Sequence, residues 1–129
     1  SRRKVVLSFV LALLGANVLY FALGRGASPG LFLALCGLLG FTGGYWAIFI
    51  TIAAEQFGTN IRATVATTVP NFVRGLVVVV NAMFLATKGS FGLAGAAATV
   101  GAVWFTAAIV AAYGLRETFG IDLDYVEPD

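Results

Sequence analysis

The residues of this chain that could do chemistry lie on one face of an apolar segment. Between residues 63 and 87, polar side chains return at spacings of four and three, which places them on one side of a helix. This polar stripe consists of Thr67, Asn71, Arg74, Val78 and Asn81, with Val78 as its apolar member. The polar members of the stripe are our candidates for lining a solute pathway.

Arg74 lies near the middle of that apolar segment. A central arginine costs about 2.5–3.5 kcal/mol on the membrane-insertion scale, so this face needs a polar cavity or a partner. In one interpretation, Arg74 lines a water-filled pathway and pairs with an anionic substrate group or with a carboxylate on another helix. In the other, the embedded helix begins at Pro70, and Arg74 snorkels to the headgroups. A pathway arginine favours anionic solutes such as carboxylates or phosphates.

Two aromatic residues of the preceding apolar segment, Tyr45 and Trp46, are further candidates for facing the pathway. Catalytic chemistry has little support, because the chain has no histidine and a single cysteine, Cys36. The usual general base and the common metal-ligand sets are therefore missing. We expect no enzymatic activity, no metal and no cofactor. The net charge of +2 is too small to indicate nucleic-acid binding.

The composition is that of a membrane protein. Hydrophobic residues make up 60% of the chain and charged residues 11%, against about 25% charged residues in soluble domains. A helix that crosses a ~30 Å hydrocarbon layer needs about 20 apolar residues, whereas barrel strands are about half as long and alternate. The sequence predicts an all-α membrane protein with four transmembrane helices within residues 1–113, followed by an acidic tail. The predicted spans are residues 5–23, 31–54, 63–87 and 93–113, and the tail is residues 114–129.

The basic residues predict how these spans are oriented. Lysine and arginine in short loops favour the cytoplasmic side. One end of the predicted bundle carries five of them: Arg2, Arg3, Lys4, Arg62 and Arg116. The opposite end carries only Arg25 and Lys88. We therefore expect an integral protein of the cell or inner membrane, with both termini and the acidic tail in the cytoplasm.

Three short motifs carry a resemblance to a known family. Residues 55–62, EQFGTNIR, resemble the E-x-F-P-x-x-x-R signature after the tenth helix of major facilitator superfamily transporters, with Gly58 in place of the proline. Residues 2–4, RRK, resemble the end of the basic loop before the ninth helix. Residues 116–123, RETFGIDL, are similar to the E-T-x-G-x-x-L ending after the twelfth helix.

The resemblance implies that this chain is a C-terminal fragment holding helices nine to twelve, part of the six-helix C-terminal bundle. It implies a secondary transporter that moves a small solute by alternating access, in which helical bundles rock about a midplane site. It also implies that Glu55 and Arg62 belong to a cytoplasmic charge network that latches one conformation. The expected partners are the remaining helices of the parent transporter, the lipid bilayer and a small-molecule solute.

The alternative is a complete small four-helix membrane protein with a scaffolding or assembly role. That alternative predicts no functional need for Arg74. As a fragment, the chain is not expected to transport, because it lacks the bundle against which it would rock. Its pathway face must still be covered, so we expect the isolated chain to self-associate.

Overall fold

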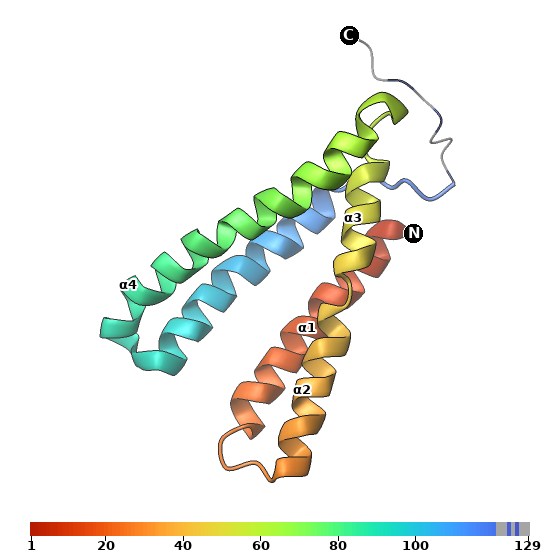
Figure 1. The fold of residues 1–129 in the computed structure, drawn as a ribbon. Helices are drawn as coiled ribbons and strands as arrows, with labels where there is room; N and C mark the ends of the chain where they lie inside the picture. Colours follow the sequence, from red (N-terminus) through yellow and green to blue (C-terminus); the bar gives the residue numbers. More distant parts are fainter. Residues whose placement is uncertain (121–123, 125, 127–129) are drawn as a thin grey trace.

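The computed structural model describes residues 1–120, 124 and 126, and within them the chain is all-α, without a strand. Four helices follow one another: α1 (Arg2–Leu23), α2 (Pro29–Gly43), α3 (Trp46–Glu55) and α4 (Thr59–Gly114) (Figure 1). In the described part, three helical stretches are long and apolar enough to cross a membrane: Arg2–Leu23, Pro29–Glu55 and Thr59–Gly114. The fold therefore fits an integral membrane protein.

Helices α1 and α2 form an antiparallel pair joined by a short loop (Figure 1). In this loop Gly26 has a φ of 76°, a conformation that glycine adopts without strain. Helix α2 then begins with the Ser28 hydroxyl accepting a hydrogen bond from the Leu31 N–H, and with Pro29 in the first turn. A serine cap followed by proline satisfies or removes backbone donors that a helix start leaves open.

The second predicted span is not one continuous helix. Helix α2 ends at Gly43 and α3 begins at Trp46, so Gly44 and Tyr45 interrupt residues 31–54 near their middle. At this break the Gly44 N–H bonds to the Phe41 carbonyl, three residues back, at 3.1 Å. Glycine has a low helix propensity, and the adjacent Gly43 and Gly44 account for a tightened turn here. Gly44 and Tyr45 keep right-handed helical backbone angles, so Pro29–Glu55 remains a single stretch long enough to cross a membrane.

Helix α4 folds back on itself at Gly92, where φ is 67° and ψ is −178°. This combination lies in a backbone region occupied almost only by glycine. The first arm, residues 59–91, and the second arm, residues 93–114, run side by side (Figure 1). Gly92 lies between the predicted spans 63–87 and 93–113, and residues 88–90 before it remain helical. The positive φ needs a glycine, and Gly92 supplies it.

The start of the first arm also differs from one expectation. The helix begins at Thr59 and continues through Pro70, which is buried within it. Pro70 is therefore not a first-turn residue of the helix, as one interpretation of Arg74 assumed. Because proline lacks an N–H, the Ala66 carbonyl loses its usual helical donor at this position.

The chain thus forms two helix pairs: α1 with α2 and α3, and the two arms of α4. The pairs meet at the end of the bundle that carries the N-terminus and separate toward the other end (Figure 1). The buried positions in the helices are mainly small or β-branched: Ala16, Ala96, Ala112, Val10 and Val100. Small residues allow helix backbones to approach closely where lipid removes the hydrophobic driving force. Many large apolar side chains are exposed, among them Phe41 and Val78. Those surfaces suit contact with lipid or with further helices.

The fold-back makes a test of backbone strain possible. Gly92→Ala should destabilise the protein by about 1–3 kcal/mol, because alanine is strained at this φ and ψ. Steric crowding does not contribute, since a Cβ at Gly92 would meet no atom within 4 Å. The measurement is SDS-induced unfolding in micelles, followed by far-UV circular dichroism.

Gly89→Ala is the matched control, three residues earlier in a helical conformation and equally open. It should be neutral or stabilising by up to about 1 kcal/mol. Equal effects of the two substitutions would contradict the turn at Gly92.

Candidate functional site

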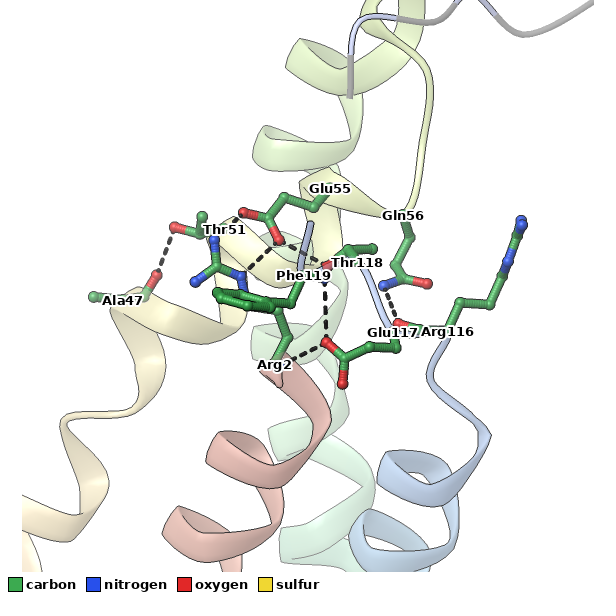
Figure 2. Close-up of polar contacts among 9 residues, drawn as sticks. All are labelled: Arg2, Ala47, Thr51, Glu55, Gln56, Arg116, Glu117, Thr118 and Phe119. Atoms are coloured by element: carbon green, nitrogen blue, oxygen red, sulfur yellow. Dashed lines mark hydrogen bonds and ion pairs between the residues drawn. The ribbon is translucent and has the colours of Figure 1, made fainter. Parts of the chain in front are cut away.

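The Glu55 carboxylate is the centre of a polar cluster at the end of the bundle where both helix pairs meet (Figure 2). Glu55 is the last residue of α3 and is nine-tenths buried. A carboxylate at a helix C-terminus is repelled by the helix dipole and is costly to bury without partners. Arg2, in the first turn of α1, supplies two contacts: its Nε donates to Oε2 at 3.1 Å and its Nη2 to Oε1 at 3.0 Å.

Thr118 completes the shell around Glu55 from the segment that follows α4. Its hydroxyl donates to Glu55 Oε2 at 2.9 Å, and the residue is buried. Oε2 therefore accepts bonds from two remote segments at once. We call Arg2, Glu55, Glu117 and Thr118 the Glu55 cluster; it joins the start of α1, the end of α3 and the tail.

Glu117 belongs to this cluster through the N-terminal end of α1, the same end that carries the Arg2 side chain. Its Oε1 accepts the backbone N–H of Arg2 at 2.7 Å, and the Ser1 hydroxyl donates to its Oε2. The first N–H groups of a helix have no intrahelical partner, and a negative charge is favourable there. The tail thus supplies the carboxylate that α1 lacks in its first turn.

The hydrogen bonds from Ser1, Arg2 and Phe119 lower the pKa of Glu117 from 4.5 to about 2, with the Ser1 hydroxyl as the largest cause. Two further contacts tie the same segments together. The Gln56 amide donates to the Arg116 carbonyl at 3.0 Å, and the Arg3 guanidinium lies 5.8 Å from the centre of the Tyr113 ring. This end of the bundle is therefore cross-linked by polar contacts of several kinds.

Arg62, the predicted companion of Glu55, lies in the first turn of α4. Its Nη2 donates to the Phe57 carbonyl in the loop after α3, at 3.1 Å. The hydrogen-bonding partners of Glu55 are Arg2 and Thr118 instead. Sequence reasoning placed these segments at one end but did not pair them. The sequence does contain a signal for this pairing. Glu55 is the single acidic residue of residues 1–116, and it lies at the same predicted end of the bundle as the basic residues 2–4.

The predicted polar stripe lies on an exposed face of the first arm. Thr67, Asn71, Arg74 and Asn81 are all exposed. Two of them bond to their own helix: the Thr67 hydroxyl donates to the Ala63 and Thr64 carbonyls, and the Asn71 amide donates to the Thr67 carbonyl. Neither Arg74 nor Asn81 has a hydrogen bond or ion pair within the described part of the chain.

Tyr45 and Trp46 lie elsewhere, at the break between α2 and α3. They line an apolar cavity of about 640 Å³ between α3 and the two arms of α4. The first arm contributes Val73, Val77 and neighbouring apolar residues to it, and no residue of the polar stripe. The two groups of predicted pathway residues therefore face different spaces.

Trp104, on the second arm, also lines this cavity, and its buried indole N–H lacks a hydrogen-bond acceptor among the described residues. Trp104 was not among the residues predicted from the sequence. The described residues contain no group of three or more histidine, cysteine or acidic side chains that could hold a metal ion.

Comparisons of the chain with protein-family models, with curated proteins and with solved structures found no match.

The Arg2–Glu55 pair generates a measurable coupling. In a double-mutant cycle, Arg2→Gln and Glu55→Gln should be coupled by about 1 kcal/mol, because Glu55 is buried while Arg2 is 42% exposed at its side chain. Lys4→Gln is the matched control, since it removes a positive charge from the same turn of α1, and Lys4 has no ion-pair partner among the residues that the structure describes. SDS-induced unfolding measures both cycles. Equal coupling energies for Arg2 with Glu55 and for Lys4 with Glu55 would contradict a specific Arg2–Glu55 contact and show that only net charge matters.

The pKa of Glu117 predicts acid resistance of its contacts. Because the folded-state pKa lies below the ordinary value of 4.5, the stability from these contacts is complete above about pH 4.5. It is lost only as the pH falls through about 2. A ¹³C-carboxyl NMR titration in micelles should give that midpoint, and Ser1→Ala should move it upward toward 4.5. A midpoint near 4.5 in the unsubstituted protein would refute the assigned contacts.

Proposed function

We propose that this chain forms helices nine to twelve of a secondary transporter of the major facilitator type. The observation that carries the proposal is the Glu55 cluster. Its members come from residues 2–4, 55–62 and 116–123, the three segments whose sequences resemble that family. Separate motifs gain weight when their residues contact one another, as Arg2, Glu55 and Thr118 do.

The lengths of the helices support four crossings. A straight helix of 56 residues would be about 84 Å long, well over twice the hydrocarbon thickness. With the turn at Gly92, each arm of α4 is long enough for one crossing. Helix α1 and the interrupted helix α2–α3 supply the other two. The count of basic residues then assigns the Glu55 cluster to the cytoplasmic side.

In this proposal the Glu55 cluster is a cytoplasmic latch. It holds α1, α3 and the tail together at the end where the helix pairs converge. Alternating access requires one end of a transporter to close while the other opens. Polar contacts at a helix end suit this role, because they can exchange for water when that end opens. Arg62, which closes the loop onto Phe57, stabilises the neighbouring start of α4.

The polar stripe supports the transporter function over the scaffolding role. An exposed Arg74 in a membrane-crossing arm is costly unless water, a solute or a partner helix covers it. A transporter pathway provides such cover, and the missing helices of the parent provide the opposite wall. The isolated chain has neither, so it should not transport.

Two linked measurements test the proposal. An antibody against residues 122–129 should detect, in membranes of the source cell, a product several times heavier than 13.4 kDa. Cells that express that product should then move radiolabelled solutes drawn from a broad panel. Arg74→Ala should reduce the rate at least about tenfold, since it removes a charge-assisted contact. Lys88→Ala, on the same arm but two turns beyond Asn81 and close to the turn at Gly92, should leave the rate unchanged.

A band near 13 kDa would contradict the proposal and favour a complete four-helix protein. An Arg74→Ala product that is inserted normally and transports at the full rate would contradict the role of the stripe.

A further inference from the structure

Arg74 is the one stripe residue whose charge must be neutralised from outside the described chain. It lies 15 residues after Thr59 and 18 before Gly92, close to the middle of the first arm. At 1.5 Å per residue, it is about 22 Å from one end of the arm and about 27 Å from the other. Arginines snorkel successfully near helix ends. From the middle of a crossing, the headgroups are about 15 Å away.

Within the four described helices, Arg74 has no carboxylate inside the membrane. Residues 1–54 and 56–116 contain no aspartate or glutamate. Glu55 lies at the far end of α3, where Arg2 and Thr118 occupy it. Glu117 is occupied by Ser1, Arg2 and Phe119 at the same end. No carboxylate of residues 1–120 is therefore placed to neutralise Arg74, and the two sources that we compare are an anion that enters the pathway and an acid of another helix.

The surroundings of Arg74 favour an entering anion with an apolar body. One turn earlier, Asn71 is held in place by its bond to the Thr67 carbonyl, at 3.0 Å. One turn later, Val78 is exposed, and Leu85 follows on the same face with a similarly exposed side chain. A planar guanidinium binds a carboxylate or phosphate through two parallel bonds. The exposed Val78 and Leu85 offer apolar contact beside it.

We propose that Arg74 binds the oxyanion group of a small organic anion, whose apolar part lies along Val78. This inference rests on the proposed transporter function and names the class of its solute. Asn71 and Asn81 flank the site as hydrogen-bonding groups of the stripe. An acid on a neighbouring helix is the competing source of negative charge.

Chemical modification of the full-length product in native membranes tests the proposal. p-Hydroxyphenylglyoxal modifies accessible arginines, and mass spectrometry measures the modified fraction at Arg74. In chloride buffer, Arg74 should react. Benzoate or inorganic phosphate at the same ionic strength should protect it, whereas benzamide, the neutral counterpart of benzoate, should not. Arg25, in the loop between α1 and α2, is the control and should react equally under all conditions.

Two results would overturn the proposal. Arg74 that resists the reagent in chloride buffer is paired with another helix or faces lipid. Arg74 that reacts equally with and without both anions binds neither. In either case a heavy gene product whose transport depends on Arg74 would leave the transporter function standing, so the two failures are distinguishable.

A second measurement uses variants of the purified full-length protein. Benzoate should raise the melting temperature followed by tryptophan emission. Arg74→Gln should weaken that binding at least about tenfold. The affinity of Arg74→Lys for benzoate should lie between those of the unsubstituted protein and Arg74→Gln, because lysine keeps the charge but lacks the two parallel donors of arginine. Lys88→Gln should bind as the unsubstituted protein does, and equal stabilisation of Arg74→Gln would contradict the site.

Discussion

The Glu55 carboxylate is buried where three segments of the chain meet, and it accepts hydrogen bonds from Arg2 and Thr118. A hydrocarbon layer excludes water, so a charge can be buried at a helix end only with partners that replace its hydration. This requirement brings the basic start of α1 and the tail to the end of α3. Arg2 is the first residue of α1 and Glu55 is the last residue of α3. Their contact therefore also fixes the ends of these two helices next to each other.

The rest of the bundle is held less tightly. Away from the Glu55 cluster the helix pairs separate (Figure 1), and large apolar side chains such as Phe41 and Val78 remain exposed. In water such surfaces would drive collapse, but against lipid they carry no such penalty. A structure that is joined at one polar end and open at the other agrees with the proposed rocking motion. It also leaves Arg74 on a face that other helices or a solute must cover.

The sequence predicts the helical class and the apolar segments because long uncharged runs have few other solutions in a membrane. It does not predict the break at Gly44 and Tyr45, since glycines are common inside continuous membrane helices and only the backbone geometry separates the two cases. The sequence predicts a connection at residues 88–92, between the third and fourth spans, and Gly92 with its positive φ lies within it. Which residue of that connection makes the turn is set by the backbone conformation, which selects glycine. The Arg2–Glu55 contact joins residues 53 positions apart, and no local pattern identifies such a pair. That the stripe residues share one face was predictable because their spacing is local, whereas no local pattern indicates what covers that face.

The central claim is that α4 crosses the membrane twice, with the Glu55 cluster on the cytoplasmic side. Single cysteines at Asn60 and Ser90, in a Cys36→Ser background, test it most directly with a membrane-impermeant maleimide on intact cells. The account predicts that Ser90→Cys is labelled from outside and that Asn60→Cys is labelled only after permeabilisation. Labelling of both positions from the same side would contradict it.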